Sequence, residues 1–305
     1  MADSNHAASP LHRFWRGWRR EIIRGGVTLA LVLGIGLVAT NRIGSFRASV
    51  LDMFSDGGER QSAEALRWVG RMPAGQQVWI RNTNGGITVE AALGDSLEVV
   101  ATKSWRGSDS TAVRVVALPH EGGITFCAMW RGEEARCESR GSYRMRGMIG
   151  REMAETRVRF AVRLPRGVAV DASTLNGAVN VAGATAPIVA VTTNGSIDAT
   201  SEKGSIKART ANGSIRATVK ALPPTGALDL ETMNGSITAT LPPKLNAELD
   251  AKTATGRIET DFALTMSGQM SQRHIVARIG TGGPRLKLAT ITGTIRLREL
   301  GREPQ

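Results

Sequence analysis

Aromatic residues are scarce in this chain of 305 residues, where Phe, Trp and Tyr together make up 4%. A core with so few rings must be built from Val, Ile, Leu, Ala and Thr, which pack best in thin layers of short strands. The long glycine-free runs that helical bundles need do not occur after residue 70, and the 35 glycines lack the period of three required by collagen. The apolar fraction of 41% is too high for a disordered chain and too low for a multi-span membrane protein. The composition therefore favours an all-β exported protein.

Cysteine is equally scarce, with Cys127 and Cys137 as the two copies. The β-type run 123–126 precedes the first cysteine and a polar stretch separates the pair, which indicates a hairpin with one cysteine on each arm. In an oxidising compartment a disulfide here closes a loop of about 11 residues and contributes about 2.5–3 kcal/mol in the chain-entropy model. Two free thiols are the alternative. A zinc site would need two more soft ligands nearby in the sequence, and none is present, so we expect neither a metal nor a cofactor.

One long uncharged run is present, residues 25–40, which would be about 24 Å long as a helix. If Arg24 snorkels to the interface, residues 22–40 approach the ~30 Å hydrocarbon core of a bilayer and form a membrane anchor. A cleaved signal peptide is the alternative, but Leu37 stands where a cleavage site requires a small residue. Residues 1–24 hold five arginines, so the positive-inside rule places them in the cytoplasm and the body of the chain outside.

The body of the chain contains a repeated unit, which is a glycine turn followed by a small residue, a β-branched residue and alternating polarity. Residues 192–197 (TTNGSI) are a typical copy. Asn-Gly tolerates positive φ and is typical of tight turns between strands. Eight copies lie well beyond chance and indicate a β-repeat architecture. The repeat-turn residues are Asn84, Gly85, Asn176, Gly177, Asn194, Gly195, Gly204, Asn212, Gly213, Asn234, Gly235, Gly256 and Gly293.

The spacing of the turns predicts how the copies are arranged. Gly177, Gly195, Gly213, Gly235 and Gly256 are 18, 18, 22 and 21 positions apart, and other breaks lie halfway between them. A rung of roughly 20 residues with a turn at each edge explains both series. Successive rungs would stack about 4.8 Å apart as a parallel β-solenoid, or β-helix, with a narrow aliphatic interior. An antiparallel meander is the alternative, since two-residue Asn-Gly loops also connect hairpins.

The asparagines of this stack would fall one above the other along one edge. Asn176, Asn194, Asn212 and Asn234 are expected to form a ladder in which each amide satisfies backbone groups of the neighbouring turn. A ligand-binding strip along the ladder is the alternative interpretation.

A smaller β region precedes the solenoid, over residues 76–170, and contains several alternating runs. Upstream of it, residues 64–69 are compatible with a short helix within a linker, residues 42–75. Residues 141–151 have no clean period and are predicted to form an exposed loop. Nine arginines stand against three glutamates in residues 136–166, which makes this segment a candidate for contact with anionic surfaces. The arginines proposed for that contact are Arg140, Arg144, Arg146 and Arg151.

Two features of the chain resemble a known family. Residues 83–89 (TNGGITV) and residues 164–168 (LPRGV), followed by tandem Thr-x-Asn-Gly-Ser-Ile units, are similar to the bacterial "putative adhesin" β-strand-repeat family. The resemblance covers roughly residues 76–300 and implies a parallel β-helix-like fold and an envelope location. Family members carry a domain of unknown function, and the family supplies no catalytic residues. The chain departs from the pattern where Thr255 and Thr292 replace asparagine.

Catalysis and nucleic-acid binding are not expected. The chain has no Gly-x-Ser-x-Gly elbow, no His-Glu-x-x-His motif and no phosphate loop. The acids of the repeats are spread one or two per rung, whereas glycoside hydrolysis needs paired carboxylates. A polysaccharide-acting β-helix enzyme is therefore a weaker alternative. Aromatic interleaving, which is typical of single-stranded nucleic-acid binding, is absent, and the expected compartment is wrong for nucleic acid.

The sequence thus predicts a non-catalytic, single-pass protein of the bacterial inner membrane, with its N-terminus inside and its bulk outside. Its solenoid would serve as an adhesive or scaffolding surface for an envelope glycan, an anionic lipid or a membrane protein. The alternative is an extracytoplasmic component of a membrane stress or signalling complex. The predicted segments are residues 1–24 (cytoplasmic tail), 25–41 (anchor), 42–75 (linker), 76–170 (β region with basic loop) and 171–300 (solenoid).

Overall fold

The computed structural model describes residues 60–106, 111–131, 136–138, 141, 143–144, 156–266 and 271–302. The predicted anchor at residues 22–40 lies outside these ranges, as do Arg140, Arg146 and Arg151. Every named element in the described ranges is a β-strand, so the all-β class is confirmed. Within the same ranges, no helix has the length and apolar character needed to cross a bilayer.

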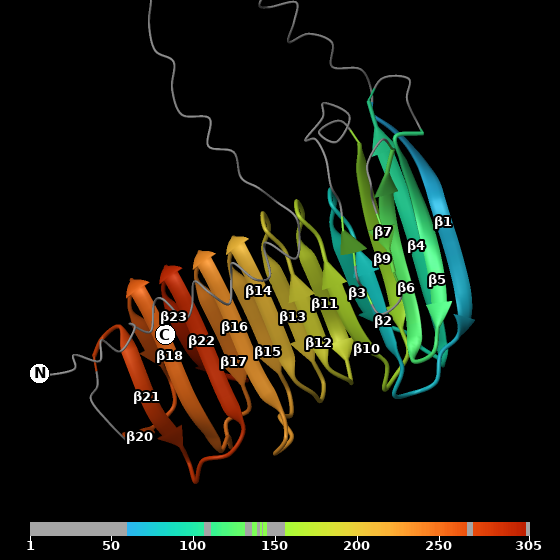
Figure 1. The fold of residues 1–305 in the computed structure, drawn as a ribbon. Helices are drawn as coiled ribbons and strands as arrows, with labels where there is room; N and C mark the ends of the chain where they lie inside the picture. The colour runs from blue at the N-terminus through green and yellow to red at the C-terminus, as the bar shows by residue number, and fades with distance from the viewer. Residues whose placement is uncertain are drawn as a thin grey trace, which may run out of the picture.

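Two long sheets lie face to face along the molecule (Figure 1). The first, called sheet A, has ten strands in the described residues and runs the whole length of the stack. In spatial order its strands are β1 (Gln61–Arg71), β4 (Ser96–Trp105), β9 (Arg157–Leu164), β3 (Ile87–Ala91), β11 (Val179–Ala184), β13 (Ile197–Ser201), β15 (Ile215–Val219), β17 (Ile237–Leu241), β23 (Ile295–Glu299) and β19 (Ile258–Thr260).

The second, called sheet B, has eleven strands in the described residues and packs against sheet A. In spatial order its strands are β20 (Leu264–Met266), β21 (His274–Ile279), β18 (Ala247–Thr255), β22 (Arg285–Thr292), β16 (Ala227–Asn234), β14 (Ile206–Asn212), β12 (Ile188–Val191), β10 (Ala169–Ser173), β2 (Gln77–Arg81), β6 (Gly123–Trp130) and β5 (Val113–His120). A short antiparallel pair, β7 (Arg136–Cys137) and β8 (Tyr143–Arg144), completes the fold.

The repeats form parallel rungs, each with one strand in sheet B, a glycine turn and one strand in sheet A. Strand β13 pairs in parallel with β11 on one side and β15 on the other, so Ile197 aligns with both Val179 and Ile215. In sheet B, β14 pairs in parallel with β12 and β16 in the same way. Residues one rung apart in the sequence are therefore direct neighbours. The parallel solenoid is confirmed, and the antiparallel meander is wrong for these strands.

The core lies between the two sheets and consists of straight aliphatic columns. In sheet A, Ile197, Ile215, Ile237 and Ile295 align from strand to strand and are at most 1% exposed. Because successive side chains of a strand point to opposite faces, the β-branched residue after each glycine turn faces inward and its neighbour faces solvent. Burial of each such side chain stabilises the fold by about 1.5–3 kcal/mol.

The N-terminal β region continues the same stack. Strand β2 pairs in parallel with β10, and β3 pairs in parallel with β11, so residues 76–170 share both sheets with the repeats. Strand β1 pairs antiparallel with β4 at the edge of sheet A. The short helix expected at residues 64–69 is wrong, because these residues belong to strand β1, where Trp68 lies between the exposed Arg67 and Val69 and packs, with Leu66, against the core. The folded body thus begins inside the predicted linker.

The C-terminal rungs do not stack in the order of the sequence. The last rung, β22–β23, lies between β16–β17 and β18–β19 in both sheets and pairs in parallel with both. Strand β21 pairs antiparallel with the other edge of β18. The turn at residues 280–284 therefore carries the chain across the start of β18, where the Pro284 carbonyl accepts a hydrogen bond from the Glu248 N–H. Sequential stacking, which the spacing suggested, does not hold here.

A single charge placed in an isoleucine column tests the rung assignment. Ile215→Asp puts a carboxylate at a position that is 0% exposed and should lower the free energy of unfolding by several kcal/mol, because no partner is available to it. Arg216→Asp, on the exposed face of the same strand, should change it by no more than about 0.5 kcal/mol. Urea unfolding followed by tryptophan fluorescence measures both variants. Equal midpoints for the two would contradict the inward placement of Ile215.

Candidate functional site

The glycine edge of the solenoid explains the repeated Thr-x-Asn-Gly-Ser-Ile motif. In six rungs a buried threonine stands two positions before the asparagine, or before the threonine that replaces it, and its Oγ1 donates to the glycine carbonyl of a neighbouring rung. Thr210, for example, donates to the Gly195 carbonyl at 2.8 Å. The other members of this threonine ladder are Thr174, Thr192, Thr232, Thr253 and Thr290, at 2.9–3.0 Å. The sequence showed these threonines without showing their role, since their acceptors lie one rung away.

The glycines of this edge stack with almost no space between turns. A Cβ on Gly213 would lie well under 3.0 Å from the Gly195 carbonyl oxygen, and the same holds for Gly235 over Gly213. None of these three has a φ in the left-handed region. At these three positions the positive φ that the Asn-Gly pattern suggested is therefore not the reason for glycine, although Gly85, Gly177, Gly256 and Gly293 of the same column do have φ between 124° and 155°. The reason is the close approach of one backbone to the next.

The asparagines form a ladder along the same edge. Asn194 Nδ2 donates to Asn176 Oδ1 at 2.8 Å, Asn212 to Asn194 at 2.9 Å, and Asn234 to Asn212 at 3.0 Å. Asn84 continues the line as a backbone bridge to Asn176, and its own amide donates to the Thr156 carbonyl. The asparagines thus form a ladder, but the amides of Asn176, Asn194, Asn212 and Asn234 bond to one another and not, as expected from the sequence, to backbone groups of the neighbouring turn.

The remaining turn residues lie at both edges of the stack. Gly85, Gly177, Gly256 and Gly293 belong to the glycine column, and Gly293 lies between Gly235 and Gly256 because of the inserted rung. Gly204 has a φ of 149° and belongs to the opposite edge, where its Cβ position faces the backbone of Ala186. The two series of turns that the spacing suggested therefore lie at opposite edges of the stack.

The basic segment after β6 is attached to the outer face of sheet B. Cys127 and Cys137 form a disulfide with their Cα atoms 6.2 Å apart. The Tyr143 hydroxyl donates to the Ala128 carbonyl at 2.8 Å and lies 3.0 Å from Thr83 Oγ1. Arg81 Nε donates to the Gly141 carbonyl at 2.7 Å. The prediction of an exposed loop is wrong for Gly141 and Tyr143, because the disulfide and these hydrogen bonds hold the chain against the sheet.

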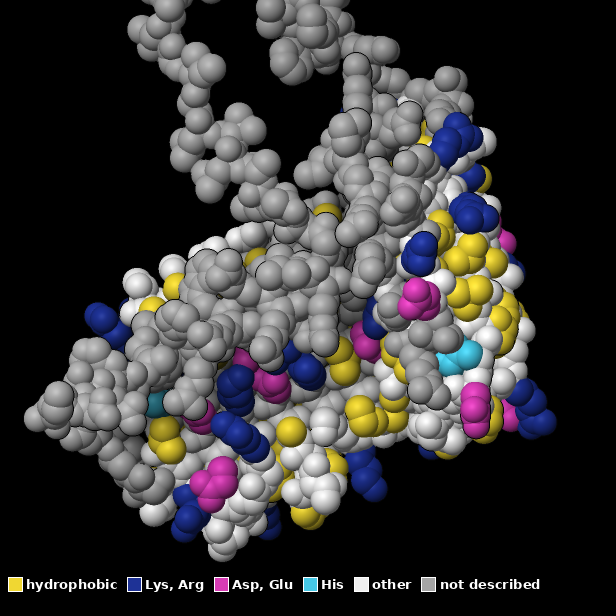
Figure 2. Space-filling view, in the orientation of Figure 1, with side chains coloured by type: hydrophobic (Ala, Val, Ile, Leu, Met, Phe, Trp, Pro, Cys, Tyr) yellow, Lys and Arg dark blue, Asp and Glu magenta, His cyan; other side chains and the backbone are white. Residues whose placement is uncertain are grey.

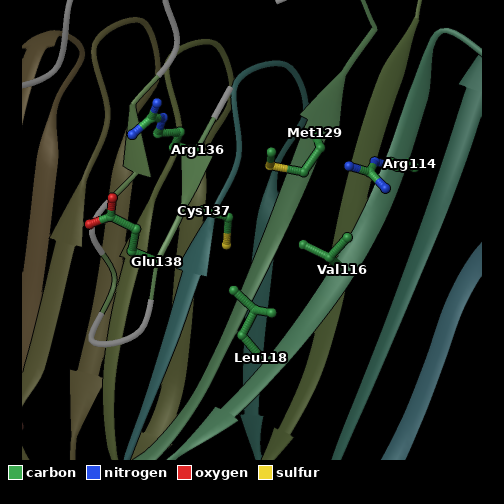
Figure 3. Close-up of a pocket in the computed structure, with 7 residues that line it drawn as sticks. All are labelled: Arg114, Val116, Leu118, Met129, Arg136, Cys137 and Glu138. Carbon is green, nitrogen blue, oxygen red and sulfur yellow. The ribbon is translucent and has the colours of Figure 1, made fainter. Parts of the chain in front are cut away.

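A shallow pocket of about 410 Å³ lies beside this disulfide (Figure 3). Its volume is within the range of small-ligand sites. Aliphatic and thioether side chains lie between arginines on its two sides, with Glu138 as its single carboxylate. Its described lining residues include neither a nucleophile–base pair nor a pair of acids. The lining residues are Arg114, Val116, Leu118, Met129, Arg136, Cys137 and Glu138.

The acids on the outer face of sheet B are engaged in ion pairs. Arg209 lies 3.1 Å from both Asp229 and Glu231, and Lys287 bonds to Glu231 from the inserted rung. Burial, together with the charge of Glu231, raises the pKa of Asp229. Burial acts in the same direction on Glu231, but the hydrogen bond from Lys287 and the charge of Arg209 outweigh it and lower the pKa of Glu231. This cluster joins three rungs and gives β22 a defined register.

Asp250 on β18 does not join these acids and pairs with other neighbours. It lies 3.2 Å from His274 Nε2 and 3.8 Å from Arg285. In the part of the chain that the structure describes, no group of three or more His, Cys, Asp or Glu side chains is placed to hold a metal ion.

These features define a class of protein, a two-sheet parallel β-solenoid whose rungs are joined by threonine, asparagine and glycine columns. The family model for Toastrack DUF4097 matches residues 138–298, which is over half of the chain. The chain therefore belongs to the Toastrack DUF4097 family, and the family resemblance drawn from the repeats is confirmed.

Solved structures of similar proteins include a putative cell adhesion protein from Clostridium sporogenes. It is 9% identical, covers 77% of this chain and 99% of its own, and has a TM-score of 0.45. A putative adhesin from Bacteroides fragilis is also 9% identical, with 77% and 96% coverage and a TM-score of 0.36. No curated protein matches the sequence.

The close approach of the glycine turns predicts the effect of one added methyl group. Gly213→Ala should lower the free energy of unfolding by roughly 2–3 kcal/mol, because the new Cβ meets a backbone carbonyl that can move only with its whole rung. Gly94→Ala is the matched control, since its Cβ meets nothing within 4 Å. Chemical denaturation compares the two. Similar midpoints for both variants would show that the turns stack less closely than described.

The single tyrosine of the chain makes the attachment of the basic segment measurable. Burial, opposed by the hydrogen bond with Thr83, raises the pKa of Tyr143 to about 12 from its ordinary value of 10.0. Absorbance at 295 nm should therefore titrate near pH 12 in the folded protein and near pH 10 in denaturant. Because the folded state retains this proton over a higher pH range, the protein should lose stability as the pH rises above about 10. A native titration near pH 10 would mean that Tyr143 is exposed.

Proposed function

We propose that this chain is a non-catalytic, membrane-anchored protein of the bacterial envelope whose solenoid is an adhesive or scaffolding surface. The observation that carries the proposal is the outer face of sheet A. Thr200, Thr218 and Thr240 align on β13, β15 and β17, with their side chains on the solvent side of the sheet. A second outer column on the same strands contains Asp198, Arg216 and Thr238.

This surface is regular and rigid. Strands of one sheet lie about 4.8 Å apart, so the three threonine hydroxyls repeat at that interval along a straight line. The hydroxyls are both donors and acceptors, and the neighbouring charges add ionic contacts. Such a face suits an extended partner with its own repeated polar groups, such as an envelope glycan or a strand-like protein segment. Because cross-rung hydrogen bonds hold the columns in place, binding requires little ordering of the protein.

The membrane anchor is supported by the uncharged run at residues 25–40 and by the five arginines before it. Envelope location is supported by the disulfide, since disulfides persist in oxidising compartments. The non-catalytic role is supported by the way the acids of sheet B are taken up in ion pairs with Arg209, Lys287 and their neighbours.

Crosslinking in intact cells with tagged full-length protein, followed by mass spectrometry, tests the proposal. We expect envelope glycan or protein to be recovered with the wild-type protein. Recovery should fall at least tenfold for the variant Thr200→Lys, Thr218→Lys, Thr240→Lys, whose long cations cover the threonine column. A matched control places the same three charges at the connection from β15 to β16, on the edge of the solenoid opposite the glycine turns. Its substitutions are Ala221→Lys, Thr225→Lys and Ala227→Lys, all at exposed positions.

Recovery that is equal for the two triple variants would overturn the assignment of this face. A second result would favour the signalling-complex alternative. In that case one defined inner-membrane protein is recovered. Its recovery is the same with and without the three lysine substitutions, and is lost when residues 22–40 are exchanged for an unrelated anchor.

A further inference from the structure

Four arginines from three separate segments gather at one end of sheet A. Arg60 immediately precedes β1, Arg106 immediately follows β4, and Arg157 and Arg159 begin β9. Strands β1 and β9 both pair antiparallel with β4, so the start of β1, the end of β4 and the start of β9 meet at the same end of the sheet. Arg157 and Arg159 lie within the basic segment 136–166, but none of the four is among the arginines proposed individually from the sequence. We call this set the arginine cluster.

The pairing register places the members of the cluster next to one another. Ser104, two residues before Arg106, aligns with Arg157, and Thr102 aligns with Arg159. Arg60 Nη1 donates to the Ser104 carbonyl at 3.4 Å, which holds it over the same end of β4. Burial lowers the pKa of Arg60, and repulsion by Arg157, Arg106 and Arg159 lowers it further. The guanidinium groups are therefore close enough to repel each other.

Three of the four arginines in the cluster, Arg106, Arg157 and Arg159, are exposed and have no carboxylate partner among the described residues. The described acids on the outer face of β1 and β4, Glu64 and Glu98, pair with Arg67. Figure 2 shows dark blue and magenta side chains lying together over the middle of the stack.

The position of the cluster in the chain identifies its partner. Arg60 follows the predicted membrane segment after the 18 residues 42–59, which can span roughly 60 Å at most when fully extended. This end of the solenoid is therefore held within about 60 Å of the bilayer that receives the anchor. Several guanidiniums without described acidic partners, held near a surface of acidic headgroups, match that surface in charge.

We propose that the arginine cluster docks the end of the solenoid onto the anionic phospholipid headgroups of the anchoring membrane. The inference rests on the anchor of the proposed function and adds an orientation to it. The body contacts the membrane through the starts of β1 and β9 and the end of β4, and the stack of rungs extends from that contact. The threonine column of sheet A, farther along the stack, stays available to partners.

The size of the effect follows from the number of charges. Each basic residue near an anionic membrane surface contributes about 1 kcal/mol, which is about a fivefold change in the ratio of docked to undocked protein. Removal of three such charges should reduce this ratio roughly 100-fold at low salt. At about 0.5 M NaCl, where screening acts within several Å, the wild-type protein should also undock.

Energy transfer from the full-length protein to dye-labelled lipid headgroups measures the docking. Because both native cysteines form the disulfide, a cysteine introduced at Ser62, beside the cluster, carries the donor dye alone. A second labelled protein carries its dye at Leu93→Cys, in the turn at the opposite end of β4. Both are reconstituted into vesicles of phosphatidylcholine alone or with about one third phosphatidylglycerol. Free inorganic phosphate, added as a competitor, distinguishes a lipid surface from a simple phosphate site.

The test variant is Arg106→Gln, Arg157→Gln, Arg159→Gln. Its matched control removes three charges elsewhere, as Lys203→Gln, Arg216→Gln and Lys244→Gln, all of which are exposed. We expect strong transfer from position 62 and weak transfer from position 93 in phosphatidylglycerol vesicles. Transfer from position 62 should be lost in the test variant, retained in the control, and resistant to millimolar phosphate.

Three outcomes would overturn the inference. Equal transfer in neutral and anionic vesicles, or equal loss in the test and control variants, would show that the cluster does not recognise headgroups. Displacement by inorganic phosphate would identify a phosphate site instead of a lipid surface. Failure of the protein to float with vesicles of either composition would remove the anchor of the proposed function and this inference with it, whereas flotation without transfer would remove the docking alone.

Discussion

The approach of one glycine turn to the next is the constraint on which the rest of the solenoid depends. Each turn places a glycine against the carbonyl of the glycine in the neighbouring rung, and that same carbonyl accepts a hydrogen bond from a buried threonine. There is no room for a Cβ and no freedom to slip by one residue, because a slip would leave the buried Thr210 or Thr232 hydroxyl without its acceptor. The register set at this edge passes along both strands of every rung. The isoleucine columns of the core and the threonine column outside follow from it.

The inserted rung shows that the same constraint can be met out of sequence order. Thr290 donates to the Gly235 carbonyl and Thr253 donates to the Gly293 carbonyl, so the ladder runs through β22–β23 before it reaches β18. Lys287 of this rung also completes the charge cluster with Glu231. The C-terminal segment is therefore an internal part of the stack. Strand β18 is held on both edges, by β22 and by β21, and the last repeats are coupled to the ones before them.

Charged side chains occur in two settings among the described residues. Several are paired between neighbouring rungs, as in Arg209 with Asp229 and Arg296 with Glu259, where they support register. At the first end, Arg106, Arg157 and Arg159 have no described acidic partner. Charges paired across rungs contribute to the fold, and charges left without partners are available to an external one. In the proposed arrangement, the scaffold contacts the membrane through its basic end and presents its polar faces to other partners.

The sequence by itself determined the features that depend on local spacing and polarity. The 18-residue interval between Gly177, Gly195 and Gly213 predicted parallel rungs, and the alternation after each turn predicted which residues face inward, because strand side chains alternate with a period of two. Only the tertiary structure decided what depends on contacts between distant segments. These are the insertion of β22–β23, the attachment of Tyr143 to Ala128, and the meeting of Arg60 with Arg106 and Arg157. Such contacts are set by which strand edges pair across long intervals of chain, and no local pattern of residues records that pairing.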